Sequence, residues 1–197
     1  MPRRARPLIN GGCYHIIARG NNRQHIFQDS EAFRHFLRCL ANAKSHYPAK
    51  LYHYCLMTNH IHFLLEILHG HDLPKFMQAV LQGYGRWHQK RIGYTGHVWQ
   101  GRYKSPLISR ESYFLEAGRY IERNPLRAGM IADLKDYRWS SYPHYAYGSP
   151  DHLLDEDPYY SDLASTAPHR QAIYREFVRI ANPYDAVLDQ EFIGRSF

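Results

Sequence analysis

The chain has 197 residues and a formal net charge of +7, and 44% of its residues are hydrophobic while 22% are charged. That length suits one compact domain, or one domain with an appendage, and can bury a sizeable core. The composition excludes a disordered chain. No apolar run approaches the roughly 20 residues that span a bilayer, and three cysteines without zinc-ligand spacing are expected to be reduced thiols of a cytoplasmic protein.

The charge is divided unevenly along the chain. Residues 1–150 hold 21 of the 25 basic side chains and 9 of the 18 acidic ones, a net charge of +12, whereas residues 151–197 have a net charge of −5. A basic body indicates a polyanionic partner. A protein with an uneven but functionally neutral charge distribution is the alternative, and charge alone does not separate the two.

The first half of the chain predicts a strand, a helix and two strands. Residues 13–19 mix β-branched and aromatic side chains before a Gly-Asn-Asn turn, which indicates a strand. Apolar positions recur at helical spacing from Ser30 to about His46, with Ser30 as the expected N-cap. Residues 51–57 and 60–68 then form two apolar strands joined by a tight turn.

The second half adds a helix, a strand and a third helix. The helical period continues over residues 73–90, and residues 102–108 form a strand that Pro106 favours at an edge. The third helix is expected to begin after Ser109, with Glu111 in its first turn, and to stop near Asn124 because Pro125 disfavours helical backbone before it.

This order predicts an α+β fold, a ferredoxin-like antiparallel sheet with helices on one face, plus an added catalytic helix and a C-terminal extension. The expected units are residues 1–147, a catalytic domain, and residues 148–197, an acidic extension with a linker and a short helix over 170–181.

The sharpest short motif is His60-Ile61-His62 at the start of a predicted strand. Residues i and i+2 of a strand point to the same face, so both imidazoles can converge on one metal ion. Because the strand is otherwise apolar, buried imidazoles need partners that offset their desolvation. The alternative is structural, with one histidine facing solvent and the other bonded to a backbone carbonyl.

Tyr120 and Asn124 are four residues apart on the third predicted helix, so they stack on one face beside its apolar stripe. A phenol oxygen and a carboxamide oxygen one turn apart can serve as a nucleophile and a metal ligand. The alternative is a tyrosine at the edge of the core and an asparagine near a helix end, neither with a catalytic role.

Basic and aromatic side chains alternate in three stretches, at residues 19–24, 99–104 and 139–142. Arginine and lysine neutralise phosphates, while aromatic faces stack on unpaired bases. The pattern favours nucleic-acid binding, although many of these aromatic side chains are also needed to fill a core.

Four stretches together resemble a known family: YHIIARGNNRQ at residues 14–24, YCLMTNHIHFLL at 54–65, GHVWQGRYKS at 96–105 and RYIERNPLRAG at 119–129, followed by WSSY at 139–142. The chain looks like a REP-associated tyrosine transposase, a relative of the single-tyrosine transposases of the HUH class, over about residues 1–147. Thr58 and Leu126 depart from the family pattern, which often has Pro and Val there, and neither departure touches a catalytic position.

The resemblance implies a role for each motif. Tyr120 would be the catalytic nucleophile, and His60, His62 and Asn124 would hold Mg²⁺ or Mn²⁺. DNA contacts are expected from basic and amide side chains, namely Arg3, Arg4, Arg6, Arg19, Asn21, Arg23, Arg102, Lys104, Arg123 and Arg127.

The implied activity is metal-dependent cleavage and strand transfer of single-stranded DNA through a 5′-phosphotyrosine, next to REP-type hairpins. The resemblance implies a nucleoid-associated monomer. A dimer whose two chains exchange the tyrosine helix is the alternative. Two other readings remain: a catalytically inactive nucleic-acid-binding protein, and a metal-dependent hydrolase of small phosphoesters.

Overall fold

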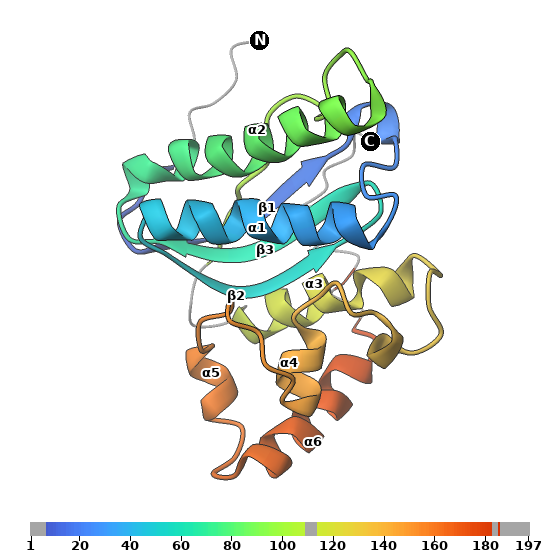
Figure 1. The fold of residues 1–197 in the computed structure, drawn as a ribbon. Coiled ribbons are helices and arrows are strands. Elements are labelled where there is room, and N and C mark those ends of the chain that lie inside the picture. Colours follow the sequence, from blue (N-terminus) through green and yellow to red (C-terminus); the bar gives the residue numbers. More distant parts are fainter. Residues whose placement is uncertain (1–6, 109–113, 183–184, 186–197) are drawn as a thin grey trace.

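Four antiparallel strands form the central sheet of the computed structural model, which describes residues 7–108, 114–182 and 185. The strands are β1 (Gly12–Arg19), β2 (Ala49–Leu56), β3 (His60–Ile67) and β4 (Leu107–Ile108), in the order β2-β3-β1-β4. The helices α1 (Ser30–His46) and α2 (Leu73–Ile92) follow β1 and β3 and lie on one face of the sheet (Figure 1). This arrangement confirms the predicted ferredoxin-like pattern.

Alternate residues of β1 supply two separate cores. Tyr14 and Ile16 pack with α1 and α2 in the larger hydrophobic cluster. Cys13 and Ile17 point to the opposite face and pack with α3 (Phe114–Arg127). Because successive strand side chains alternate between faces, β1, β2 and β3 each contribute to both layers. The sheet lies between α1 and α2 on one side and α3 on the other (Figure 1).

Two predicted boundaries need correction. Asp29, not Ser30, caps α1, because its carboxylate accepts hydrogen bonds from the backbone N–H groups of Glu31 and Ala32, both at 3.0 Å. The fourth strand is shorter than residues 102–108. Only Leu107 and Ile108 pair as a strand with β1, and Lys104 forms an isolated bridge with Ile17. Ser109 and Glu111 lie outside the described residues.

Helix α3 does not stop at Asn124, as predicted, but continues through Pro125 to Arg127. A proline removes the N–H that would bond the carbonyl four residues earlier, here that of Ile121. The side chain of Asn124 replaces it, because its Nδ2 donates to the carbonyl oxygens of Ile121 at 3.1 Å and of Tyr120 at 2.9 Å. The helix therefore tolerates a proline in its last turn.

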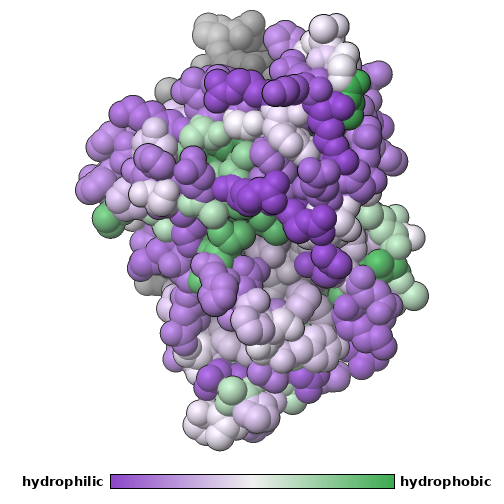
Figure 2. All heavy atoms as spheres, viewed as in Figure 1, coloured by the Kyte–Doolittle hydropathy of each residue, from purple (hydrophilic) through white to green (hydrophobic). Residues whose placement is uncertain are grey.

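The remaining elements pack against the outer side of α3 (Figure 1): α4 (Tyr142–Tyr147), α5 (Pro158–Ser161) and α6 (Ala167–Arg179). Three short 3-10 helices, η1 (Asn21–Arg23), η2 (Gly70–Asp72) and η3 (Leu134–Asp136), complete the described chain. The predicted linker contains α5 and the buried Asp157. None of the helices in the described ranges is long and apolar enough to cross a membrane, and hydrophilic side chains cover most of the visible surface (Figure 2).

Candidate active site

Two histidines lie together at the start of β3. His60 and His62 leave the strand on the same face, and their ring centroids are 4.9 Å apart. Burial lowers the pKa of His62 well below its ordinary value, and burial together with the nearby charge of Arg19 lowers the pKa of His60 to about 4. Both imidazoles are therefore neutral at neutral pH, which is the form that can bind a metal ion.

Each histidine has one ring nitrogen occupied within the protein. Nδ1 of His62 lies 2.9 Å from Nε2 of His15, and Nδ1 of His60 lies 2.6 Å from Oδ1 of Asn59. Nε2 of His62 is buried and has no hydrogen-bond partner among the described residues. A buried, unpaired nitrogen costs free energy unless something binds it. The Nε2 atom of His62 is therefore suited to bind a metal ion as a ligand.

Tyr120 reaches the same place from α3, which covers the face of the sheet on which both histidines lie. Its ring centroid lies 6.2 Å from that of His62 and 5.8 Å from that of His15, and its ring is nearly perpendicular to both. The side chain is fully buried, and the Arg127 guanidinium lies 5.0 Å from the ring centroid. A phenol, two imidazoles of β3 and a positive charge thus meet in one cluster.

The hydrogen bonds of Asn124 determine which atom of its amide is presented outward. Nδ2 is occupied by the carbonyls of Tyr120 and Ile121, so the amide oxygen is the atom turned away from the helix backbone. Among the described residues, no group of three or more His, Cys, Asp or Glu could hold a metal ion. A site based on His60 and His62 therefore needs a ligand of another type, and an amide oxygen is suitable for Mg²⁺ or Mn²⁺.

Comparison with known families decides what kind of protein carries this cluster. The family model for IS200-like transposases matches residues 9–124, more than half of the chain. The chain belongs to the IS200-like transposase family. This membership confirms the predicted enzyme class, a transposase.

Two relatives of this IS200-like transposase carry the name that the sequence motifs suggested. A REP-associated tyrosine transposase of Haemophilus influenzae is 22% identical over 173 residues, covering 77% of this chain and 97% of the relative. A solved structure of a REP-associated tyrosine transposase bound to a REP hairpin matches with a TM-score of 0.64 and 18% identity, covering 80% of this chain and 93% of that one. The structural match confirms the fold.

Behind Tyr120, α3 of the transposase is fixed by a buried polar network that the sequence did not reveal. His53 of β2 lies between two carboxylates, with Nδ1 2.9 Å from Glu122 and Nε2 2.8 Å from Asp157. Glu122 also accepts hydrogen bonds from Ser141 and, at 2.8 Å, from Tyr174. Burial alone opposes a charged His53, but the two carboxylates outweigh it and raise its pKa to about 9. The only sequence signal was a histidine inside an apolar strand.

The predicted DNA-binding residues occupy different environments. Asn21 and Arg23 lie in η1 directly after β1, and Arg19 pairs with His60 across the sheet. Arg102 is exposed. Lys104 forms a bridge with Ile17, which pairs with His62. The Arg127 guanidinium lies over the Tyr120 ring, so both basic residues lie near the histidine cluster. Arg3, Arg4 and Arg6 lie outside the described residues.

Arg123 does not fit the predicted role in DNA binding. Its Nη1 donates to the carbonyls of Val178 at 2.6 Å and Arg179 at 2.7 Å, at the end of α6, and its side chain is buried. A guanidinium held in this way fastens α3 to the C-terminal extension. Basic residues of one helical motif can therefore point to opposite faces of the helix. The sequence pattern alone does not distinguish these two orientations.

Proposed function

We propose that this transposase cleaves and rejoins single-stranded DNA next to REP-type hairpins, with Tyr120 as the nucleophile. The observation that carries the proposal is the meeting of Tyr120, from α3, with His62, from β3, at 6.2 Å between ring centroids. The hairpin is proposed because a relative of similar fold has been solved with a REP hairpin bound. The basic body of the chain suits such a polyanion.

In this proposal His60 and His62, through their Nε2 atoms, and Asn124, through its amide oxygen, hold Mg²⁺ or Mn²⁺. The bound ion supplies stabilisation of the charge that develops on the scissile phosphate. Imidazole ligands suit Mn²⁺ better than Mg²⁺, and the amide oxygen suits both. The neutral state of both histidines keeps their lone pairs available across the physiological pH range.

Tyr120 attacks the phosphorus of the scissile phosphodiester, and the bond to the 3′ oxygen breaks. The products are a 5′-phosphotyrosine and a 3′-hydroxyl, with the phenolic proton transferred overall to the departing oxygen. The covalent bond conserves the phosphodiester, so a 3′-hydroxyl can later attack it and rejoin strands without another energy source. Arg127, 5.0 Å from the Tyr120 ring, adds positive charge beside the attacked phosphate.

We further propose that residues 1–147 carry the chemistry and that residues 148–197 hold α3 in place. We propose a monomer, in which Tyr120 acts with the histidines of its own chain. His53 and Arg123 connect α3 to the extension on the side away from the cluster. A tyrosine helix exchanged between two chains would have to form these buried bonds with the partner chain.

The test is a covalent protein–DNA adduct on a denaturing gel, using a REP-like hairpin with a single-stranded flank and Mn²⁺. The wild type is expected to form the adduct, and Tyr120→Phe is expected to form none. Tyr137→Phe is the matched control, because this buried tyrosine shares a hydrophobic cluster with Tyr120 and its hydroxyl donates to the carbonyl of Leu56.

Three outcomes would contradict the proposal. An adduct formed by Tyr120→Phe would show that Tyr120 is not the nucleophile. Tight binding without cleavage, in every divalent ion tried, would favour a catalytically inactive DNA-binding protein. Cleavage without any adduct would favour a hydrolase.

A further inference from the structure

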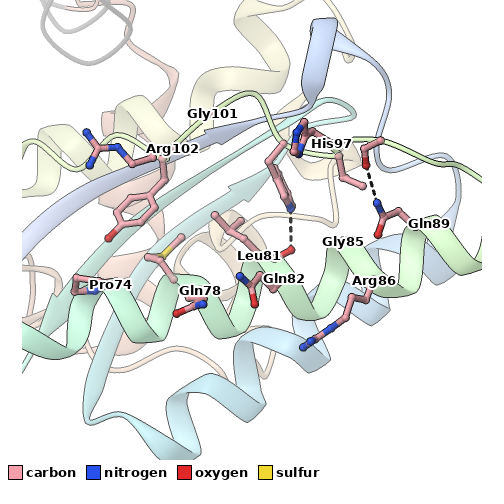
Figure 3. A pocket seen from close by; sticks show the side chains of 15 residues that line it. Pro74, Gln78, Leu81, Gln82, Gly85, Arg86, Gln89, His97, Gly101 and Arg102 are labelled. Atoms are coloured by element: carbon pink, nitrogen blue, oxygen red, sulfur yellow. Dashed lines mark hydrogen bonds between the residues drawn. The ribbon is translucent and has the colours of Figure 1, made fainter. Parts of the chain in front are cut away.

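A concave surface lies on the opposite face of the sheet from the histidine cluster. It is a groove of about 650 Å³ between α2 and residues 96–103 (Figure 3). Residues of one face of α2, spaced three or four apart, form one wall, and the segment that follows α2 forms the other. A groove of this volume is in the range of small-molecule and nucleotide sites.

The two walls are tied together, so the groove is formed before any ligand arrives. The indole Nε1 of Trp99 donates to the carbonyl of Leu81 at 2.8 Å, and Nε2 of Gln89 donates to the carbonyl of Gly96 at 2.6 Å (Figure 3). The floor between these ties is apolar, with Met77, Leu81 and Val98 buried. A planar, largely apolar group can therefore enter without unfolding a wall.

The rim carries polar groups that the protein itself does not use. The side chains of Gln78, Gln82, Arg86 and Arg102 are exposed and make no hydrogen bond or ion pair within the described chain. No aspartate or glutamate lines the described groove. Glutamine amides match the paired donor and acceptor on a base edge, and arginines match phosphate. The combination of apolar floor, amides and cations is suited to a nucleotide.

The groove lies close to the proposed cleavage site across the sheet. Gln100 N donates to the carbonyl of Arg19 at 2.8 Å, and Arg19 is paired with His60 on the next strand. Two strand spacings, about 10 Å, therefore separate this wall of the groove from His60. A single DNA strand of a few nucleotides can cross the sheet edge and contact both.

We propose that this groove binds unpaired nucleotides of the same DNA strand that Tyr120 cleaves, with bases against Gln78 and Gln82 and phosphates against Arg86 and Arg102. The inference rests on the proposed function for the identity of the polymer. Because a glutamine amide reads N6 and N7 of adenine in two parallel hydrogen bonds, adenine is the base that the groove prefers.

The experiment measures binding in the Tyr120→Phe background, so that it does not depend on cleavage. The probes are a fluorescent hairpin with a single-stranded, adenine-containing flank and the same hairpin with abasic sites in that flank. The Gln78→Ala/Gln82→Ala double variant is expected to bind the first probe about tenfold more weakly and the second with unchanged affinity. The matched control is Gln28→Ala, an exposed glutamine outside the groove.

Arg86→Ala tests the phosphate contact separately. It is expected to weaken both probes equally and to lower the slope of log affinity against log salt by about one. Arg34→Ala, an exposed arginine of α1, is expected to leave the slope almost unchanged. The substituted positions are all exposed, namely Gln78, Gln82, Arg86, Gln28 and Arg34, so the variants are expected to keep the fold, which a thermal melt checks.

Equal weakening of the intact and abasic flanks by the glutamine variant would overturn base recognition, and no weakening of either would overturn the groove as a DNA site. Failure of the proposed function has a different signature, since the wild type would then form no adduct on the same hairpin, whatever its affinity.

Discussion

His15 orients a proposed metal ligand, and its removal is expected to weaken metal binding without unfolding the protein. Nδ1 of His62 lies 2.9 Å from Nε2 of His15, and both side chains are buried. If His62 binds a metal ion through Nε2, its proton must be on Nδ1, and His15 must accept it. His15→Leu removes that acceptor and leaves the His62 N–H buried and unsatisfied.

The loss of such a partner typically costs 10- to 100-fold in metal affinity, which corresponds to about 1.4 to 2.8 kcal/mol. We expect a fall of this size in Mn²⁺ affinity for His15→Leu, measured by titration calorimetry and by the electron paramagnetic resonance signal of free Mn²⁺. His15→Gln, whose amide oxygen can accept from Nδ1, should recover much of the affinity.

Two further measurements distinguish orientation from general damage. His88→Leu removes another buried imidazole, on α2, and should leave Mn²⁺ affinity unchanged. Nitrogen NMR of the His62 ring should show the Nδ1–H tautomer in the wild type and a mixture in His15→Leu. Equal Mn²⁺ affinity in wild type and His15→Leu would refute the reasoning, whereas a wild type that binds no Mn²⁺ would refute the metal site itself.

Three other expectations follow from α3 and its surroundings. Pro125→Ala returns an N–H to the carbonyl of Ile121, so the amide of Asn124 is less firmly held; DNA cleavage should fall several-fold while thermal stability holds or rises, in contrast to a plain helix defect. Gly118→Ala places a Cβ 2.6 Å from Nε2 of His53, so the clash should outweigh the roughly 0.5–1 kcal/mol gained by helix propensity and give a net loss of about 1–3 kcal/mol in denaturant unfolding. The pKa of His53 is raised to about 9. Its contribution to the free energy of unfolding, on the order of 3 kcal/mol, is therefore complete below pH 6.5 and is lost as the pH rises through 9. In denaturant unfolding at several pH values, a His53→Gln variant should show a stability that depends less on pH.

Local patterns predicted the layers of the fold well. Strand alternation and helical periodicity located β1, β3, α1 and α2 because these signals depend on neighbours along the chain. The end of α3 was predicted wrongly for the opposite reason: the rule that a proline ends a helix holds for the backbone alone, and here the Asn124 side chain supplies the missing donor. A side-chain bond of this kind has no periodic signal.

The residues of the candidate site also divide into those with a local sequence pattern and those without one. His60 and His62 were predicted as a pair because two histidines on one strand face form a local pattern, and their ring centroids do lie 4.9 Å apart. His15 and His53 were missed because their partners, His62 and the pair of Glu122 and Asp157, are distant in sequence. Net charge also did not reveal that Asp157, an acidic residue of the extension, is buried and bonded to His53.

The bond between the Asn124 amide and the Ile121 carbonyl restricts how this stretch of sequence can change. Position 124 has two duties in the proposed function, since the amide nitrogen donates to the Ile121 carbonyl and the amide oxygen is the proposed metal ligand. Glutamine could present an oxygen, but its longer stem would have to reach the same carbonyl from a different rotamer, and aspartate offers no donor at all. A substitution at 124 that removes the amide donor therefore leaves the Ile121 carbonyl without its replacement bond unless position 125 regains an N–H.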